Sequence, residues 1–466
     1  MRKFTFSGGV FPPERKELSQ ECPIQNVIPS SKKVCIPVTM GGAPNQVLVN
    51  VGDKVKKGQL IANGNAFMSV PVHASVSGTV KKIGPILAAG NLEKIAVEIL
   101  SDESDEIDFM EPLDPFTCDK DAALKRIKDA GIVGMGGAAF PTHVKLNPPP
   151  TAVIDSVIIN AAECEPYLTI DERTMLESPE KVVDGLAIVM QVTGVMQKAE
   201  GRGYIGLEEN KIRCSEPLQK AIDDKKYSNK IEIRILKTKY PQGCEKMLTK
   251  AILNREIPTK GLPANIGCVI CNVGTVCAIS DAFRLGKPLI ERTLTISGGA
   301  VSKPVNLRVP VGTMVSDLKG DIFTLKEGET SKILVGGPMM GFAMPNDEFP
   351  IEKNNNGILF LSKQEFDISK ESPCINCGMC LKSCPVNLIP ALMKRQIEIN
   401  NLDKALNLGL MDCIECGSCT FSCPAHIKLV QHFRVAKNKV RAKMAADKAK
   451  ADAAKAAAES KKEGDK

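Results

Sequence analysis

Short apolar runs alternate with turn residues throughout the first hundred positions. Valines recur at every second position over residues 47–51, and further runs follow at residues 55–61 and 77–80. Gly-Asp and Gly-Asn pairs stand between these runs. A period of two, interrupted by turn residues, predicts short β-strands. We therefore expect a small β-sandwich over residues 1–100.

The pattern changes after an acidic, proline-containing stretch at residues 101–115, which we interpret as a linker. The mostly apolar segment at residues 153–159 predicts a buried strand, and the segment at residues 231–236 predicts another strand. Residues 179–192 have helical periodicity, and another helix is expected from Cys244 onward. This alternation of strands and helices predicts an α/β domain over residues 118–290. A short β-rich piece follows around residues 293–318, and the chain from residue 370 onward is predicted to be helical apart from two cysteine runs.

Seventeen cysteines are an odd number, so they cannot all pair as disulfides within one chain. Eight of them form two runs with the spacing C-x2-C-x2-C-x3-C-P, which is the ligand run of bacterial ferredoxins. In that run the fourth cysteine ligates the other cluster. We therefore assign one [4Fe–4S] cluster to Cys374, Cys377, Cys380 and Cys423, and a second to Cys413, Cys416, Cys419 and Cys384.

Zinc is the alternative for these cysteines, but zinc sites use two CxxC pairs or include histidine, and they do not need four cysteines followed by proline. The helical stretch between the runs, residues 389–399, completes a helical ferredoxin-like module. The other nine cysteines stand mostly in apolar contexts, and we interpret them as small buried residues.

Iron–sulfur clusters relay single electrons, so a hydride donor or acceptor requires an organic cofactor as well. Gly134, Gly136 and Gly137 would let the backbone approach a phosphate, and Lys145 would add positive charge. A tight packing turn is the alternative for these glycines. Asn160, Glu163 and Glu165 follow a predicted buried strand, where a ligand crevice of an α/β sheet lies, and a solvated turn is their alternative.

The net charge of +7 is concentrated at the C-terminus, because residues 437–466 contain ten Lys or Arg against five Asp or Glu. With no Trp and four Tyr, the chain offers few rings for base stacking, and we expect no nucleic-acid binding. The Ala/Lys-rich tail is expected to be solvated and partly helical, with a weak contact to a membrane surface or to another subunit as the alternative. The sequence contains no run of 18 apolar residues and its N-terminus has no signal-peptide pattern.

Three segments together carry a family resemblance: GMGGAAFPTHVK at 134–145, NAAECEPYLTIDER at 160–173 and CNVGTVCAI at 271–279. They resemble the flavin- and NADH-binding motifs of the flavoprotein subunit of NADH:quinone oxidoreductases. With the sandwich and the double cysteine run, residues 1–430 resemble the RnfC family, the C subunits of Rnf electron transport complexes. Residues 51–83 also resemble a biotinyl/lipoyl carrier, but the expected hairpin tip, residues 66–70, has no lysine to modify, so we expect a docking role instead.

The resemblance implies a multidomain α/β fold. Its parts are an N-terminal β barrel-sandwich (1–100), a central FMN- and NADH-binding α/β domain (118–290), an SLBB-like β-grasp piece (291–345), a helical module with two [4Fe–4S] clusters (365–435) and the tail (437–466). It also implies an oxidoreductase component that exchanges electrons between NAD(H), FMN and the clusters. Partner subunits would couple this exchange to translocation of Na⁺ or H⁺.

The resemblance implies FMN contacts at Gly134, Gly136, Gly137, Lys145, Asn160, Glu163, Asn272 and Thr275, and nicotinamide contacts at Phe140, Glu165, Gly243 and Glu245. The sequence departs from the flavoprotein subunit at Met135, where that subunit has arginine, and at Cys244, which interrupts its Gly-Glu-Glu. No general acid–base pair is expected.

The expected partners are the other subunits of a membrane complex and, through them, ferredoxin. The expected location is peripheral, on the cytoplasmic face of the cell membrane. Two alternatives remain: an NADH-oxidising subunit of a soluble hydrogenase or related reductase, and a flavin-free ferredoxin-like scaffold.

Overall fold

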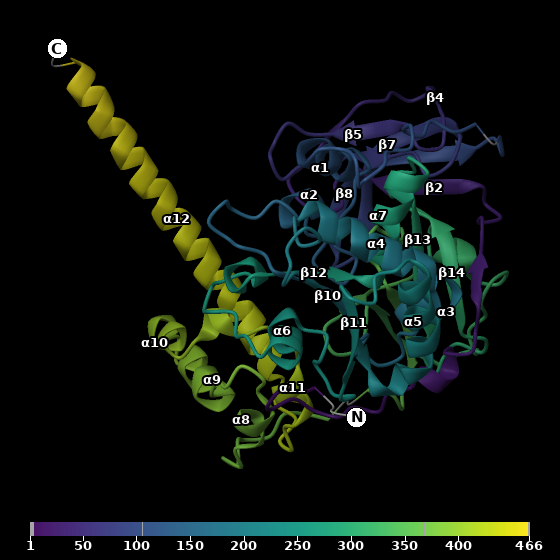
Figure 1. The fold of residues 1–466 in the computed structure, drawn as a ribbon. Coiled ribbons are helices and arrows are strands. Elements are labelled where there is room, and N and C mark those ends of the chain that lie inside the picture. Colours follow the sequence, from purple (N-terminus) through teal and green to yellow (C-terminus); the bar gives the residue numbers. More distant parts are fainter. Residues whose placement is uncertain (1–3, 105, 367–368, 465–466) are drawn as a thin grey trace. The chain divides into compact units, whose positions relative to one another are not determined.

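The computed structural model describes residues 4–104, 106–366 and 369–464 (Figure 1). Residues 1–3, 105, 367–368 and 465–466 lie outside this description, and with them small parts of the predicted sandwich, linker, cluster module and tail. The chain divides into two compact units. One contains Met1–Phe6 and Phe11–Asp367, and the other contains Ser7–Val10 and Ile368–Lys466.

The N-terminal part of the first unit is a β-sandwich, as the alternating valines predicted. One sheet has the order β2-β8-β7-β4 and the other the order β3-β5-β6. Inward-facing residues of both sheets form one apolar core that includes Val34, Val55, Ile61 and Val97. The strands are β2 (Lys33–Pro37), β3 (Gln46–Val47), β4 (Lys54–Val55), β5 (Leu60–Asn63), β6 (Val72–His73), β7 (Gly78–Ala88) and β8 (Leu92–Ser101).

The first thirty residues do not all belong to this sandwich. β1 (Ile24–Asn26) pairs with β14 of a different sheet, and Phe4 forms a bridge with Leu236 in the central domain. The range 1–100 therefore contains segments that complete two other parts of the first unit. Sequence alternation could not show this, because both pairings join residues far apart in the chain.

The central domain contains four parallel strands in the order β11-β10-β9-β12. One face packs under α1, α3, α4, α5 and α7, and the opposite face packs under α6 (Figure 1). The predicted helix at 179–192 is α4 and the predicted strand at 231–236 is β11. The elements are α1 (Lys120–Asp129), α2 (Thr142–Lys145), β9 (Ser156–Ala161), α3 (Ile170–Glu177), α4 (Pro179–Val192), β10 (Arg202–Glu208), α5 (Ser215–Asp224), β11 (Ile231–Leu236), α6 (Glu245–Leu253), β12 (Cys268–Asn272) and α7 (Val273–Arg284).

The strand order reverses between β9 and β12. The chain forms β9, β10 and β11 side by side and then returns to place β12 on the other side of β9. Ligands of open α/β sheets bind outside the carboxyl ends of the strands at such a reversal. The sheet therefore predicts a binding crevice next to the last residues of β9 and β12.

A third, six-stranded sheet has the order β1-β14-β13-β17-β15-β16. β13 and β17 are parallel neighbours at its centre, while β14 and β15 pair antiparallel on either side. The sheet reaches beyond the range 291–345, because β17 and β1 lie outside that range. Its other strands are β13 (Glu291–Ser297), β14 (Val305–Pro310), β15 (Thr330–Val335), β16 (Phe342–Met344) and β17 (Gly357–Ser362).

The second unit is helical, as predicted, with α8 (Met379–Ser383), α9 (Pro390–Glu398), α10 (Leu402–Asn407), α11 (Ser418–Phe421) and α12 (Leu429–Gly464). Phe433, Ala436 and Val440 of α12 lie in its apolar core. Lys437 is also buried, so the packed part of this helix continues past the predicted start of the tail at residue 437. Among the helices that the structure describes, none is both long and apolar enough to cross a membrane.

Candidate cofactor sites

Asn160 and Asn272 stand at the strand reversal, as register partners near the ends of β9 and β12. The Asn160 amide donates to the carbonyl oxygen of Gly243 at 2.7 Å. The Asn272 amide donates to an Asp171 carboxylate oxygen at 2.7 Å, and its oxygen accepts from the backbone N–H of Gly274 at 2.9 Å. Asn272 therefore caps α7, whose N-terminus has unpaired N–H groups and a partial positive charge.

The glycine loop lies beside this helix start. The N–H of Gly134 donates to the carbonyl of Phe140 at 2.8 Å and closes the loop, while Gly136 and Gly137 are exposed. A Cβ on Gly137 would meet no heavy atom within 4 Å, and on Gly136 the nearest would be Asn272 Cβ at 3.4 Å. Gly185, by contrast, is a packing glycine, because its Cβ would lie 2.1 Å from the Val276 carbonyl oxygen. Packing against the protein therefore does not require glycine at either position, although the positive φ of Gly137, 151°, favours glycine there. The open space fits a cofactor that approaches the backbone.

Three side chains from other segments hold this loop. The N–H of Met135 donates to Thr275 Oγ1 at 3.0 Å, and Asn354 donates to the carbonyl of Gly137 at 2.8 Å. Arg292 donates to the carbonyl of Met135 at 3.1 Å. The predicted residue Thr275 thus fixes the loop through its hydroxyl group.

Lys145 and Glu245 form an ion pair at 3.2 Å, and the Lys145 ammonium also donates to the carbonyl of Ile270 at 3.0 Å. Burial alone would lower the pKa of Lys145, but the Glu245 carboxylate outweighs it and the pKa is raised. Lys145 is therefore charged at neutral pH. Phe140, at the end of the glycine loop, is 37% exposed.

The two predicted carboxylates after β9 are enclosed, so the alternative of a solvated turn is wrong. Glu163 accepts from the N–H of Asp171 at 2.7 Å, and its side chain is 3% exposed. Glu165 accepts from the N–H of Met339 at 3.0 Å and from the Tyr240 hydroxyl at 3.4 Å. Burial raises the pKa of Glu165 to about 7.

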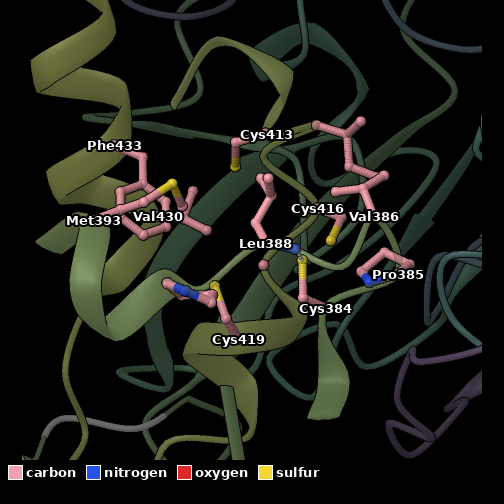
Figure 2. Close-up of a pocket in the computed structure, with 13 residues that line it drawn as sticks. Cys384, Pro385, Val386, Leu388, Met393, Cys413, Cys416, Cys419, Val430 and Phe433 are labelled. Carbon is pink, nitrogen blue, oxygen red and sulfur yellow. Dashed lines mark hydrogen bonds between the residues drawn. The ribbon is translucent and has the colours of Figure 1, made fainter. Parts of the chain in front are cut away.

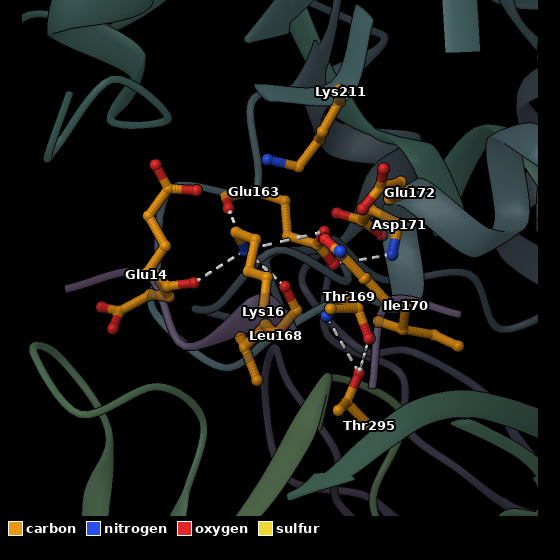
Figure 3. A network of polar contacts seen from close by, with 12 residues as sticks. Glu14, Lys16, Glu163, Leu168, Thr169, Ile170, Asp171, Glu172, Lys211 and Thr295 are labelled. Atoms are coloured by element: carbon orange, nitrogen blue, oxygen red, sulfur yellow. Dashed lines mark hydrogen bonds and ion pairs between the residues drawn. The ribbon is translucent and has the colours of Figure 1, made fainter. Parts of the chain in front are cut away.

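Lys16, which sequence reasoning did not single out, organises this turn (Figure 3). Its buried ammonium donates to the carbonyls of Glu163 at 2.9 Å and Glu165 at 3.1 Å, and also to that of Leu168. Burial lowers the pKa of Lys16, with Lys211 as a further cause. Lys16 lies far from this turn in the sequence, so no local motif could identify it.

Cys384, Cys413, Cys416 and Cys419 surround one cavity in the second unit (Figure 2). They are the four cysteines predicted to hold the second cluster. Met393, Val430 and Phe433 line the same cavity with apolar surface. Among the described residues, no group of three or more His, Cys, Asp or Glu is placed to hold a single metal ion. Four cysteines around one cavity match the number and type of ligands that a [4Fe–4S] cluster takes.

Electrostatic neighbours among the cysteines cross between the two runs. Burial is the main cause that raises the pKa of Cys380, and the neighbouring Cys423 and Cys374 raise it further. For Cys419 the neighbours that raise the pKa are Cys413, Cys416 and Cys384, again after burial. Cys384 therefore lies beside the first three cysteines of the second run, and Cys423 lies beside Cys380 of the first run.

The two sets differ in burial. Cys374 and Cys377 are exposed, whereas Cys384, Cys416 and Cys419 are buried. All seventeen cysteines are free thiols. Of the nine outside the runs, the buried ones are Cys35, Cys214, Cys268 and Cys271, and the half-buried ones are Cys22, Cys118, Cys164, Cys244 and Cys277.

Three family models match the chain. The RnfC barrel sandwich hybrid domain matches residues 4–104, the Nuo51 FMN-binding domain matches residues 127–281, and the 4Fe-4S dicluster domain matches residues 373–427. The three matches cover the sandwich, the central domain with its glycine loop, and both cysteine runs.

Curated relatives match over nearly the whole chain. The C subunit of the proton-translocating ferredoxin:NAD(+) oxidoreductase complex of Clostridium ljungdahlii is 46% identical, over 96% of each chain. The Na(+)-translocating counterpart of Acetobacterium woodii is 42% identical, over 94% of this chain and 97% of that protein. The C subunit of the ion-translocating oxidoreductase complex of Rhodobacter capsulatus is 40% identical, over 94% of this chain and 84% of its own length.

Among solved structures, an NAD+-reducing [NiFe]-hydrogenase in the H2-reduced state aligns with a TM-score of 0.46 at 18% identity. The alignment covers 70% of this chain and 65% of that chain, which is less than two thirds of its length.

Proposed function

Because the chain belongs to the RnfC family, the C subunits of ion-translocating ferredoxin:NAD(+) oxidoreductase complexes, we propose that it passes electrons between NAD(H), FMN and two [4Fe–4S] clusters. The observation that carries this proposal is the open glycine loop beside the strand reversal, in a chain that also carries a cavity lined by four cysteines. Bound FMN would supply hydride exchange with the nicotinamide and single-electron exchange with the clusters. The protein would supply placement and electrostatics.

We assign the FMN site to Gly134, Gly136, Gly137, Lys145, Asn160, Glu163, Asn272 and Thr275. The open space at Gly136 and Gly137 supports a close approach of the cofactor to the backbone. The α7 N-terminus next to the loop supports binding of the phosphate, because helix N-termini favour anions. Lys145 adds a positive charge, and Asn160 and Asn272 fix the two sides of the crevice.

We assign the nicotinamide side to Phe140, Glu165, Gly243 and Glu245. Phe140 offers an exposed ring at the end of the loop. Gly243 and Glu245 lie next to the FMN residues through their contacts with Asn160 and Lys145. The Glu165 carboxylate accepts hydrogen bonds from Met339 and Tyr240. These bonds fix the position of its side chain in the absence of a ligand.

The cluster ligands follow the crossed pattern: Cys374, Cys377, Cys380 and Cys423 for one cluster, and Cys413, Cys416, Cys419 and Cys384 for the other. The cavity lined by the second set supports this assignment most directly. The proximity of Cys380 to both Cys423 and Cys374 supports the first set.

The sheet around β13 is proposed to be the SLBB-like β-grasp piece of this family. Parallel central strands β13 and β17, flanked by antiparallel β14 and β15, support a β-grasp arrangement. Its strand β13 and the segment before β17 provide Arg292 and Asn354, which hold the glycine loop. The proposed role of this piece is to support the flavin site.

The other subunits of the complex are the partners of this chain, and ferredoxin would deliver electrons through them. We propose a peripheral position on the cytoplasmic face of the cell membrane, with the N-terminal sandwich as the docking surface. Two relatives are named for different coupling ions, H⁺ and Na⁺. The coupling step would therefore belong to the partner subunits, with this chain as the site of NAD(H) chemistry.

Anaerobic purification with iron, sulfide and flavin quantitation tests the proposal. We expect about eight iron, eight sulfide and one FMN per chain, and bleaching of the flavin band by NADH. Clusters without flavin would instead indicate the ferredoxin-like scaffold. A flavoprotein that purifies with soluble hydrogenase or reductase subunits, and not with membrane subunits, would support the other alternative.

A further inference from the structure

Arg292 is the largest fully buried side chain of the described residues, and it lies under the glycine loop. It belongs to β13 in the third sheet, yet its guanidinium reaches the central domain. One nitrogen is 3.1 Å from the carbonyl oxygen of Met135, and another is 3.1 Å from the Met135 sulfur. The guanidinium thus contacts the backbone and the side chain of the residue between Gly134 and Gly136.

The same guanidinium lies at the start of α7. A Cβ on Gly274, in the first turn of that helix, would be 2.9 Å from Arg292 Nη1. The partial positive charge of the helix N-terminus and the full charge of Arg292 are therefore next to each other. A guanidinium next to a helix N-terminus makes this place electropositive, and such a place favours an anionic ligand.

Arg292 keeps its charge. Burial lowers its pKa to about 10, with the distant Asp171 carboxylate acting in the opposite direction. Among the residues that the structure describes, no carboxylate oxygen lies within 4.0 Å of the guanidinium. Its other neighbour is the carbonyl of Asn355. The guanidinium therefore has carbonyl groups as its direct polar partners, and the Asp171 carboxylate acts on it only from beyond ion-pair distance.

We propose that Arg292 supplies a second positive charge, besides Lys145, next to the flavin loop and strengthens binding of the FMN phosphate, while its bond to the Met135 carbonyl positions the loop. This inference rests on the proposed FMN site. The β-grasp piece would thus contribute electrostatically to a cofactor bound by another domain. Arg292 is a positioning residue here, because it acts through the loop and the helix start.

The test compares FMN with riboflavin, which has the same ring system and no phosphate. The full chain is purified anaerobically, its flavin is removed, and each flavin is titrated by fluorescence quenching. Arg292→Gln keeps a donor for the Met135 carbonyl and removes the charge. We expect about tenfold weaker FMN binding, equivalent to about 1.4 kcal/mol, and unchanged riboflavin binding.

The second part of the test moves the positive charge from residue 292 to residue 135. Because the Met135 sulfur touches the Arg292 guanidinium, the double variant Met135→Arg/Arg292→Gln returns a cation to the same place. We expect it to restore FMN affinity to within about threefold of wild type. Arg308→Met is the control, since Arg308 lines the same cavity as Arg292, on the neighbouring strand β14, without contacting the loop. It should bind both flavins as wild type does.

The proposal is wrong if Arg292→Gln binds FMN like wild type, if both flavins weaken equally, or if the double variant restores nothing. The wild-type protein provides a check that does not depend on any variant. Equal affinity of the wild type for FMN and riboflavin would also overturn the proposal. Failure of the wild type to bind FMN while it retains both clusters would instead contradict the proposed function.

Discussion

Asn160 and Asn272 face each other as register partners at the strand reversal, and each amide holds a different segment of the site. Asn160 binds the Gly243 carbonyl and Asn272 binds Asp171. The loop after β11 and the start of α3 are therefore fixed to the same edge of the sheet. A crevice that is closed on two sides by side-chain amides is prepared before any ligand enters it.

A side chain at Gly137 should block the cofactor. Its Cβ would enter open space, so the cost of Gly137→Val to folding is the backbone strain of a side chain at positive φ. The variant should lower FMN occupancy at least about tenfold and retain both clusters. Flavin and iron content of the purified protein measure this. Gly320→Val is the matched control, because Gly320 also has a positive φ and open space around its Cβ but lies in the third sheet's loops. Full FMN retention in Gly137→Val would contradict the loop assignment.

Crossed ligation predicts which cluster each cysteine supports. Cys423→Ala should lower iron from about eight to about four per chain by removing the cluster of Cys374, Cys377 and Cys380. Adding Cys374→Ala to Cys423→Ala should then remove no more iron, whereas adding Cys413→Ala should remove the remainder.

Cys118→Ala is the control, since Cys118 is a half-buried thiol outside the runs and should leave all iron in place. If Cys374→Ala and Cys423→Ala had additive effects on iron content, each run would hold its own cluster and the crossed assignment would be wrong.

Lys353 should make the stability of the protein depend on pH. It is fully buried and donates to the carbonyls of Pro71 and Gly131 at 2.8 Å each. Burial lowers the pKa of Lys353 to about 7. Between pH 7 and about 10.4 the unfolded lysine binds a proton that the folded one does not, so folding stability should rise with pH over this range.

The free energy of unfolding should rise by at most about 5 kcal/mol over this range, because the pKa of Lys353 differs between the folded and unfolded states and each pKa unit corresponds to about 1.4 kcal/mol. Melting temperatures at pH 7, 8, 9 and 10 should increase more for wild type than for Lys353→Met. Parallel pH profiles of the two proteins would show that Lys353 is charged in the folded state across the whole range.

Docking through the sandwich predicts an effect of exposed apolar residues on its surface. Leu48 is 54% and Val51 is 61% exposed. With the partner subunits co-expressed, the double variant Leu48→Glu/Val51→Glu should shift the protein from the membrane fraction to the soluble fraction. Leu262→Glu, at an equally exposed residue of the central domain, should not.

Truncation after Val440 tests the tail without disturbing the described packing of α12, because Val440 is the last buried residue of this helix among those whose side chains the structure describes, up to residue 450. We expect most of the truncated protein to remain with the membrane. Release by this truncation alone would mean that the tail carries the attachment and that the sandwich does not.

Local patterns predicted α4 and β11 to the residue, because both elements have strong periodicity and clear ends. The cysteine runs likewise carry their own spacing, so the residues around the second cavity could be named from the sequence. The glycine loop was found for the same reason.

Residues that act across domains could not be found in this way. Lys16, Arg292 and Lys353 each reach a carbonyl more than a hundred positions away. A buried cation of this kind differs from a surface lysine or arginine only through its long-range neighbours. Strand β1 joins a sheet formed by residues some 280 positions later for the same physical reason. The tail boundary was set too early, because composition alone does not show that Lys437 bonds to the Cys413 carbonyl and to Glu415.

The unequal burial of the two cysteine sets predicts the order in which the two clusters are lost on exposure to air. Dioxygen and chelators reach a cluster through its exposed ligands, and Cys374 and Cys377 are open to solvent while Cys416 and Cys419 are not. The cluster at Cys374 should therefore be lost first. A partly degraded sample would retain the inner cluster and about four iron per chain, which is also the composition expected of a ligand mutant. The time that a sample has been exposed to air, as well as the variant, therefore determines which cluster a spectrum detects.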